Sequence, residues 1–495
     1  MKTLENIDNE IICLYTCAKH LIKILKNYYI LTIGKTSDKC IFIRLVFKCM
    51  TYENRFAFKD NNYNDIYKLL LENNNPSYNF DDDTKVIYLT YFLGSIYQKI
   101  SFMLKENTHT EDVIIPDNIK IQYNYNTKIL ADEKIINLSN TIFNNEDFEK
   151  LCEIKMNAIN LNFENNGISD LSPLKSENIN YLQNLNLSKN CIKNIDVFNK
   201  LKLENLKELI LAQNKISNIS IFENAKINNL EKLYLNNNKI NNINVLKNVN
   251  FNNLINLDLS HNKIDDISIL ENCEFNQLTD LNLSKNEITE IFIKKLFSFP
   301  SLKFLNINYN KISKIIINGR IKLPKIKNIN LSHNLIKEIN INKLQKLKKL
   351  SLLNLSSNHI KNLSFLEILE IKNIKELYLN NNEIEKIDIL GKRYINIRKI
   401  TILNLSCNNI SNIKAMKKMF FENILGLYLN KNIVKSINPL ENIYFPKLIY
   451  LDVSENSFDV RLQKNRDIIQ NILCKNNGIH ILKYDSPNLF HGYFQ

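Results

Sequence analysis

The sequence predicts an α/β solenoid with a parallel inner sheet and short 3₁₀ or helical outer segments, preceded by a small, mainly helical N-terminal domain. The main observation is a 24-residue period, in which an asparagine follows a Leu-x-x-Leu-x-Leu pattern, as at 230–238. A chain of 495 residues is too long for one ordinary core but suits an extended array. The period is absent at both ends, which indicates different structure there.

The repeated asparagine occurs at thirteen positions, spaced 24 residues apart except for 26 residues between the tenth and the eleventh. A degenerate copy at 135–138 precedes them, with Phe143 in place of the asparagine. The chain has about 85 asparagines, but their fixed spacing favours a folded array over a disordered, asparagine-rich chain. The thirteen positions are Asn166, Asn190, Asn214, Asn238, Asn262, Asn286, Asn310, Asn334, Asn358, Asn382, Asn408, Asn432 and Asn456.

Each Leu-x-Leu segment alternates, so it suits a short strand whose leucines point to one side. Strands stacked in parallel at about 4.8 Å per step would give an inner face about 60 Å long. The repeated asparagine lies between apolar positions, so we expect a buried amide bonded to the backbone of its own and adjacent repeats, as a ladder. Aspartate lacks the NH₂ donor, which explains the choice of asparagine. The spacing of Ile240, Ile243 and Leu246 predicts a single outer turn of 3₁₀ or helical type.

This pattern resembles the leucine-rich repeat family, whose period runs from 20 to 29 residues. The resemblance covers roughly 130–460. The Ile-x-x-Ile-x-x-Leu tail resembles the subtype of the regulatory leucine-rich repeat subunit of type-1 protein phosphatase and of bacterial internalins. Those repeats typically have about 22 residues, so the period of this chain is longer. The resemblance implies an intracellular protein-binding solenoid.

Four regions are predicted along the chain. Residues 1–110 form a helical N-terminal domain with no assigned role, because apolar residues recur at helical spacing in 10–30 and 83–105 and because 65–72 suits a short helix. Residues 111–134 form a connector, and 135–460 contain the repeats, with a helix at 146–155 in the first one. Residues 461–495 form a C-terminal cap, with a helix at 461–474 and a strand at 479–482 that cover the end of the array.

The sequence predicts no enzyme, no cofactor and no metal site. It contains no Walker loop, dinucleotide fingerprint, His-Glu-x-x-His or Gly-x-Ser-x-Gly motif. His261 and His333 occupy the same repeat position three repeats apart, which places them about 14 Å apart, too far to share a zinc ion.

The sequence favours the cytoplasm, with the nucleus as the alternative, and no membrane partner. The first apolar stretch, 11–33, carries Lys19, His20, Lys23 and Lys26, so it predicts neither a signal peptide nor a membrane span. The nine cysteines form no Cys-x-x-Cys pair, as in a reducing compartment. Five Asn-Leu-Ser glycosylation acceptors share one position on the expected inner face, where glycans would block binding.

The net charge of +14 allows a nucleic-acid partner, but the basic residues that carry this charge do not favour direct binding. Only seven of the 65 basic residues are arginine, and an equally simple explanation is a compositional bias towards lysine. One position of each expected strand forms a central column on the inner face, from Asn162 to Asp452. The side chains of this column are mostly short and polar, and they form no lysine or arginine stripe.

Aromatic residues on the inner face are the candidate contacts, since aromatic side chains dominate interface hot spots. The alternative is that these rings only cover strand edges. We therefore predict a non-enzymatic scaffold or regulatory adaptor that binds a protein on its concave face. Two alternatives remain: regulation of type-1 phosphatase, with its catalytic subunit as partner, and membership of an RNA-associated assembly. The candidate partner-binding residues are Tyr234, Phe304, Tyr309, Tyr378, Tyr428 and Tyr450.

Overall fold

The computed structural model describes residues 29–35, 40–47, 50–57, 122–125, 134–139, 145–369, 371–392, 397–475 and 481–483. The chain divides into two compact units. The first contains Met1–Lys134 and Glu149–Asn157, and the second contains Ile135–Phe148 and Ala158–Gln495. Among the described residues, no helix has both the length and the apolar character needed to cross a bilayer.

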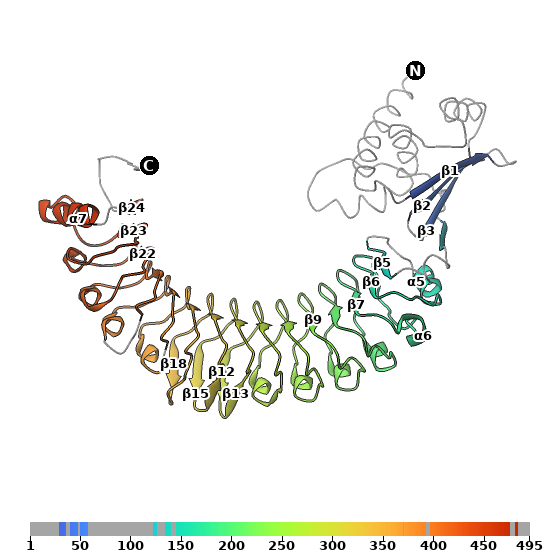
Figure 1. Ribbon diagram of the computed structural model, residues 1–495, viewed down its shortest axis with the longest axis horizontal. Coiled ribbons are helices and arrows are strands. Elements are labelled where there is room, and N and C mark those ends of the chain that lie inside the picture. The colour runs from blue at the N-terminus through green and yellow to red at the C-terminus, as the bar shows by residue number, and fades with distance from the viewer. Residues whose placement is uncertain are drawn as a thin grey trace, which may run out of the picture. The chain divides into compact units, whose positions relative to one another are not determined.

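The described strands of the first unit form a four-stranded antiparallel sheet, whose first three strands are drawn in blue in Figure 1. It consists of β1 (Tyr29–Lys35), β2 (Cys40–Phe47), β3 (Met50–Ala57) and β4 (Gln122–Tyr125), paired in that order. The β-branched and aromatic residues of β2 have high strand propensity.

This sheet adds strands that the sequence analysis did not predict in the N-terminal region. Helices were predicted at 10–30, 65–72 and 83–105, and apart from Tyr29 and Ile30, which begin β1, these segments lie outside the described residues. The connector at 111–134 contains β4, which pairs with β3. A local pattern could not reveal that pair, because its two strands are far apart in the sequence.

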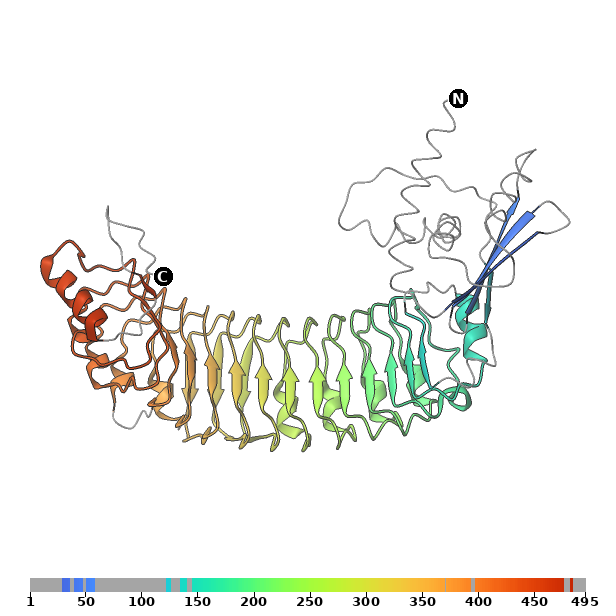
Figure 2. The same ribbon diagram turned by 45° about the horizontal axis from the view of Figure 1, so that its top comes forward.

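The second unit is the repeat array, and its main feature is a fifteen-stranded sheet with parallel pairing throughout. The unit curves, with this sheet on its concave side (Figures 1 and 2). The predicted parallel inner sheet is therefore confirmed. Its strands are β5 (Ile135–Asn137), β6 (Asn160–Asn162), β7 (Asn184–Asn186), β8 (Glu208–Ile210), β9 (Lys232–Tyr234), β10 (Asn256–Asp258), β11 (Asp280–Asn282), β14 (Phe304–Asn306), β17 (Asn328–Asn330), β19 (Leu352–Asn354), β20 (Glu376–Tyr378), β21 (Ile402–Asn404), β22 (Gly426–Tyr428), β23 (Tyr450–Asp452) and β24 (Ile481–Lys483).

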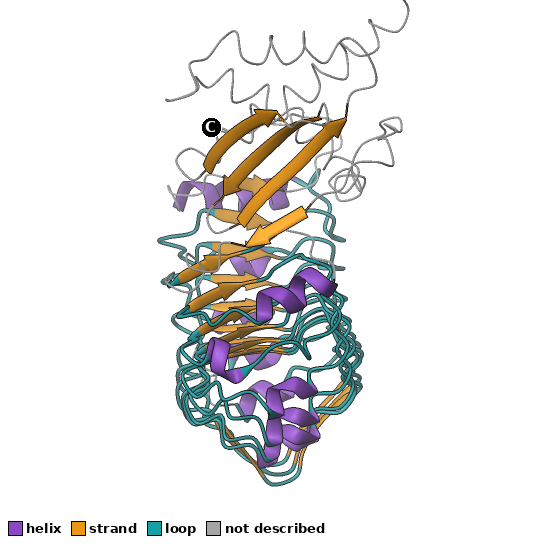
Figure 3. Cartoon of the chain, turned by 90° about the vertical axis from the view of Figure 1, so that its right-hand side faces the viewer, coloured by secondary structure: helices purple, strands orange, loops and turns teal. Residues whose placement is uncertain are grey.

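The convex side of most repeats is a short 3₁₀ helix, as the apolar spacing of three predicts. Viewed along the array, successive repeats superpose, with loops joining the strands to these helices (Figure 3). The 3₁₀ helices are η1 (Asp196–Asn199), η2 (Ser220–Glu223), η3 (Asn244–Lys247), η4 (Ser268–Asn272), η5 (Ser364–Glu367), η6 (Asp388–Gly391), η7 (Lys414–Lys418) and η8 (Asn438–Leu440). Three α-helices are described outside the N-terminal sheet: α5 (Asn145–Cys152), α6 (Ser176–Ile179) and α7 (Gln463–Lys475).

Three consecutive repeats in the middle of the array have strands on the convex side instead. Two small parallel sheets form there: β12 (Glu290–Ile293), β15 (Lys314–Ile317) and β18 (Glu338–Ile341) in one, and β13 (Leu296–Ser298) with β16 (Arg320–Lys322) in the other. Their Ile-rich sequences have higher strand propensity than the segments that form 3₁₀ helices elsewhere. The backbones approach closely, since a Cβ on Gly319 would lie 1.8 Å from the carbonyl oxygen of Lys295.

Gln345 ends the two-stranded convex sheet. Its side chain is 1% exposed and takes the place of a further strand beside β16. Its Nε2 donates to the carbonyl oxygen of Gly319 at 3.2 Å, and its Oε1 accepts from the N–H of Ile321 at 2.8 Å. One amide side chain thus pairs a backbone donor and a backbone acceptor that would otherwise remain unbonded at the edge.

We expect Gln345→Ala to lower the free energy of unfolding by about 2–3 kcal/mol, because it leaves two backbone groups unpaired in a buried place. Chemical denaturation measures the change. Lys346→Ala is the matched control, since Lys346 is exposed and adjacent, and it should change stability by less than about 0.5 kcal/mol. Equal effects of the two substitutions would contradict the edge-capping role.

The core of the array is a continuous apolar layer between the concave sheet and the convex segments. The three leucines of a repeat, for example Leu230, Leu233 and Leu235, are fully buried. Buried phenylalanines of neighbouring repeats pack on one another, as in Phe421 and Phe445, whose ring centroids lie 5.1 Å apart. The repeats with convex strands line an apolar cavity of about 110 Å³, so the packing there is incomplete.

Candidate protein-binding face

The concave face is built from two residues of each strand. The central residue, such as Leu233 in β9, is buried, and the residues on either side of it face inward, since side chains of a strand alternate. The sheet register aligns these residues in two columns, and we call the one after each central leucine the second column. The second column is Asn162, Asn186, Ile210, Tyr234, Asp258, Asn282, Asn306, Asn330, Asn354, Tyr378, Asn404, Tyr428 and Asp452.

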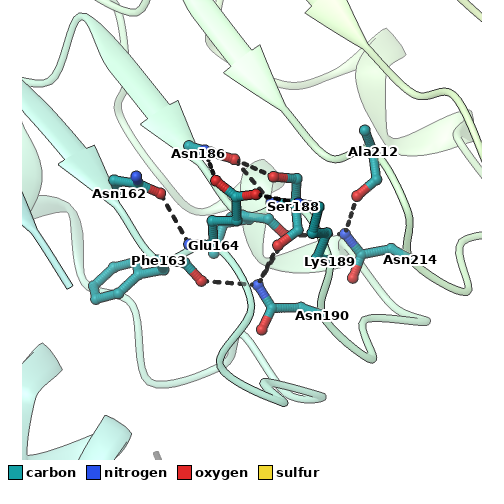
Figure 4. Close-up of polar contacts among 10 residues, drawn as sticks. Asn162, Phe163, Glu164, Asn186, Ser188, Lys189, Asn190, Ala212 and Asn214 are labelled. Atoms are coloured by element: carbon teal, nitrogen blue, oxygen red, sulfur yellow. Dashed lines mark hydrogen bonds and ion pairs between the residues drawn. The ribbon is translucent and has the colours of Figure 1, made fainter. Parts of the chain in front are cut away.

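The repeated asparagines form a ladder beneath this face. In Figure 4, the Nδ2 of Asn190 donates to the carbonyl oxygen of Phe163 in the preceding repeat, at 2.9 Å. It also donates to Leu187 of its own repeat at 3.0 Å. The Oδ1 of Asn190 accepts from the N–H groups of Asn166 and Ile168, each at 3.0 Å. From Asn190 to Asn456, each ladder amide therefore links its own repeat to the preceding one, with both ends of the amide bonded.

The residue before each ladder asparagine has a left-handed backbone, with φ between 52° and 57°, and none of the thirteen is glycine. The backbone N–H at this position reaches into the next repeat, as in Lys189, which donates to the carbonyl oxygen of Ala212 at 2.9 Å. This explains why His261, His333 and Cys407 share a position: they occupy the turn that precedes the ladder. A left-handed residue with a Cβ costs roughly 1 kcal/mol, which the bonds between repeats offset.

The second column is mainly structural, because most of its polar side chains close a turn of their own repeat. The Oδ1 of Asn186 accepts from the N–H of Ser188 at 3.0 Å and from its hydroxyl at 2.6 Å. Asp258 and Asp452 accept in the same way from the residue two positions later. The sequence signal was present as Asn-x-Ser or Asp-x-Ser in most repeats, which is typical of a turn closed by a side chain.

The tyrosines of the second column occupy the position from which Asn or Asp closes the turn in other repeats. Tyr234, Tyr378 and Tyr428 replace the oxygen acceptor with a phenol ring, and Ile210 is the other apolar exception. Because these repeats lack the side-chain turn bond, the local fold does not explain their aromatic residues.

The six candidate contact residues lie in three separate places on the face. Tyr234 lies on β9, and Phe304 and Tyr309 lie in the repeat of β14. Tyr378, Tyr428 and Tyr450 lie on β20, β22 and β23, within four adjacent strands. Only this last group brings three candidates together.

The group at β20–β23, with its two carboxylates, is called the C-terminal patch and consists of Glu376, Tyr378, Tyr428, Tyr450 and Asp452. Tyr428 and Tyr450 stack with ring centroids 4.7 Å apart and an interplanar angle of 30°. The absence of a side chain at Gly426 makes room for the ring of Tyr428, because a Cβ there would lie 2.9 Å from that ring. Leu425 and Ile449, at the starts of β22 and β23, are 39% and 44% exposed and extend the apolar surface.

Each of two tyrosine hydroxyls in the C-terminal patch donates to a carboxylate on its own strand. The hydroxyl of Tyr378 donates to Glu376 at 3.0 Å, and that of Tyr450 donates to Asp452 at 3.3 Å. Burial, followed by the bond to Glu376 and its negative charge, raises the pKa of Tyr378 to about 12. Tyr378 therefore remains a protonated donor at every physiological pH.

The middle of the face carries a second, smaller aromatic group. Tyr309 stacks on His333 of the next repeat, with ring centroids 4.2 Å apart and nearly parallel planes. The Nζ of Lys285 lies 5.6 Å from the centroid of Tyr309, on the preceding repeat. Phe304, which precedes Tyr309 in the same repeat, is 40% exposed. Lys285, Tyr309 and His333 occupy the left-handed turn position of three successive repeats. Periodicity alone did not indicate that these three side chains contact one another.

The charge of the face differs from that of the chain. Although the chain carries +14, the inward positions of the fifteen strands carry five carboxylates and two lysines. Lys232 pairs with Glu208 at 3.5 Å, and Lys483 of β24 is in register with Asp452. The basic surplus therefore lies outside these positions, and the strand face would repel rather than bind a phosphate backbone. The five carboxylates are Glu208, Asp258, Asp280, Glu376 and Asp452.

His, Cys, Asp and Glu are the side chains that could bind a metal ion in the described residues. Within this part of the chain, no three His, Cys, Asp or Glu side chains come together as a metal-binding group. Burial, followed by the nearby Lys285, lowers the pKa of His261, so this side chain is neutral at pH 7. Burial raises the pKa of the Cys273 thiol to about 12, which makes it a poor nucleophile.

Comparisons with known proteins agree with this architecture. A family model described as leucine-rich repeats, in two copies, matches residues 204–248. A crystal structure of the APL1 leucine-rich repeat domain is similar, with a TM-score of 0.53 and 18% identity over 78% of this chain and 94% of that one. An internalin, inlF from Listeria monocytogenes str. 4b F2365, has a TM-score of 0.49 and 20% identity over 74% of this chain and 95% of that one. A search of curated proteins gives no significant match. The repeat pattern, its ladder and the shared fold together show that residues 135–456 form a leucine-rich repeat solenoid.

Proposed function

We propose that this chain is a non-enzymatic scaffold or regulatory adaptor whose concave face binds a protein partner, with the C-terminal patch as the main contact. The observation that carries the proposal is the placement of Tyr378 and Tyr428. They occupy column positions where most other repeats close their turn with Asn or Asp, so the aromatic rings are not required by the fold.

The surroundings of the patch support a protein partner. Rigid aromatic side chains bury a large area at low entropic cost, and exposed Leu425 and Ile449 add apolar surface at the same place. The leucine-rich repeat fold commonly mediates protein–protein interaction, and its stacked repeats hold these side chains on a rigid sheet. The middle group around Tyr309 and His333 provides a second contact on the same face.

The proposal is tested by capture of partners from a cell extract with the full chain and a variant carrying Tyr378→Ala, Tyr428→Ala and Tyr450→Ala. We expect the variant to recover at least about tenfold less of the specific partner, because three anchor rings are lost. The control variant carries Tyr181→Ala and Tyr444→Ala, two tyrosines that are 51% and 69% exposed outside the inner strands. Unchanged capture by the folded triple variant would reject the site.

The same experiment addresses the two narrower alternatives. Regulation of type-1 phosphatase requires that the catalytic subunit be among the recovered proteins. Membership of an RNA-associated assembly requires that RNA-binding proteins be recovered through protein contacts, because the acidic inward strand positions do not favour RNA itself. We place the chain in the cytoplasm, with the nucleus as the alternative, and imaging of the tagged full chain tests that placement.

A further inference from the structure

Building on the proposed function, we propose that the C-terminal patch recognises two lysine or arginine side chains, four residues apart, on an extended segment of the protein partner. In this arrangement, one cationic group lies beside Glu376 and Tyr378, and the other lies beside Asp452 and Tyr450. The rings of the patch provide faces over which the cations pack.

The carboxylates of the patch differ from several others on the array, which pair with a lysine of a neighbouring repeat. Examples are Glu287 with Lys311 at 2.9 Å and Glu455 with Lys431 at 3.6 Å. Among the described residues, no lysine or arginine lies within 4.0 Å of Glu376 or Asp452. In a chain with 65 basic and 51 acidic residues, the half-buried Glu376 thus keeps its negative charge available on the binding face, and the mostly buried Asp452 adds a second negative charge close to this face.

The local environment holds both carboxylates in position. Asp452 is 6% exposed and accepts from the N–H and hydroxyl of Ser454 at 3.1 and 2.6 Å. Glu376 accepts from Tyr378, and its neighbours across the sheet are Leu352 and Ile402, so only apolar side chains flank it in its column. The register places Lys483 of β24 beside Asp452, which makes Glu376 the more informative residue to change.

The aromatic rings suit the same ligand. A cationic group over a tyrosine face is attracted by the ring, and the attraction adds to that of a nearby carboxylate. The sheet register places Tyr378 and Tyr428 in the same column two strands apart, and Tyr428 stacks on Tyr450, so the ring surface continues from the Glu376 end of the patch towards Asp452. An acidic or phosphorylated segment would meet repulsion at both ends of this surface.

The spacing of the cations follows from the geometry of the sheet. Glu376 lies on β20 and Asp452 on β23, three strands away, which corresponds to about 14 Å. An extended peptide that crosses the strands advances about 3.3 Å per residue, so two side chains about four residues apart span this distance. Residues four apart in an extended segment also point to the same side, towards the patch.

The test measures binding of fluorescein-labelled peptides of roughly twelve residues to the full chain by fluorescence anisotropy. Each peptide has a Gly-Ser background and carries two arginines four apart, two arginines one apart, a single arginine, or two glutamates four apart. We expect the first peptide to bind about tenfold more tightly than the single-arginine peptide, and the glutamate peptide not to bind. Specific binding is informative because a net charge of +14 opposes non-specific attraction of cations.

Isosteric variants locate the contact. Glu376→Gln should weaken binding of the first peptide about five- to tenfold, and Asp452→Asn should weaken it by a similar factor. Glu385→Gln, an exposed carboxylate outside the strands, removes the same charge and should leave binding unchanged. Equal binding of all cationic peptides, or an equal loss with Glu385→Gln, would overturn the inference.

The outcomes separate this inference from the proposed function. If the tyrosine triple variant loses its partner from extract while Glu376→Gln and Asp452→Asn retain it, the face binds proteins but does not select basic residues. If all three patch variants keep both the partner and the peptide, both proposals fail.

Discussion

Asn334→Asp is expected to lower the free energy of unfolding by about 3–5 kcal/mol, the largest effect of any single conservative change in the array. The Nδ2 of Asn334 donates to the carbonyl oxygens of Ile307 and Leu331, each at 3.1 Å, and the side chain is 5% exposed. The substitution would place a carboxylate oxygen against two carbonyl oxygens and bury a charge. The penalty should decrease as the pH falls, because burial raises the pKa of the introduced carboxyl and its protonated form can donate.

Asn330→Asp is the matched control in the same repeat. The side-chain oxygen of Asn330 accepts from the N–H and hydroxyl of Ser332, and the turn does not use its NH₂ group as a donor. Aspartate already accepts in this way at Asp258 and Asp452. We expect a change below about 1 kcal/mol. Urea denaturation followed by circular dichroism measures both, and similar losses for Asn330→Asp and Asn334→Asp would show that the ladder does not depend on the amide donor.

Phe421→Ala is expected to cost about 3–5 kcal/mol, because it removes a large buried ring and leaves a cavity next to Phe445. Phe421 is 2% exposed and its ring lies 5.1 Å from that of Phe445 in the following repeat. Each repeat of a solenoid contacts mainly its neighbours, so the loss should be concentrated at the C-terminal end of the array. Hydrogen exchange should therefore show faster exchange in the strands around β22 than in those around β9.

The adjacent residue provides the control for this prediction. Phe420 is 46% exposed, and the guanidinium of Arg398 lies 4.2 Å from its ring centroid. Phe420→Ala removes the same side chain from a surface site and should cost less than about 1 kcal/mol. If both substitutions destabilise equally, the core does not depend on the phenylalanine contacts between repeats.

The arrangement of the array also explains why its binding face can vary. Stability depends on buried leucines, on the ladder and on bonds from the left-handed turns, all of which lie beneath or beside the inward positions. Ion pairs between repeats, such as Lys189 with Glu164 at 2.8 Å, are exposed and contribute little individually. Tyr378, Tyr428 and Tyr450 are inward residues that close no turn, so they are open to selection for a partner without loss of the fold.

The sequence alone determined the architecture of the array and the position of every ladder asparagine, because a fixed period forces each repeat into the same environment. It did not reveal the N-terminal sheet, since β3 and β4 are distant in sequence and their pairing has no local signature. It also did not reveal the cap that Gln345 forms on the convex sheet, which depends on backbone groups of the preceding repeat.

For the candidate site too, the sequence identified some features and the tertiary structure was needed for others. Composition and column position identified Tyr378, Tyr428 and Tyr450, since exposed aromatic residues in a regular array are conspicuous. Only the tertiary structure showed that the polar residues between them close turns, that two of the rings stack, and that Glu376 and Asp452 lie beside them. Periodicity decides which residues share a face, but the contacts across neighbouring strands decide which of them can act together.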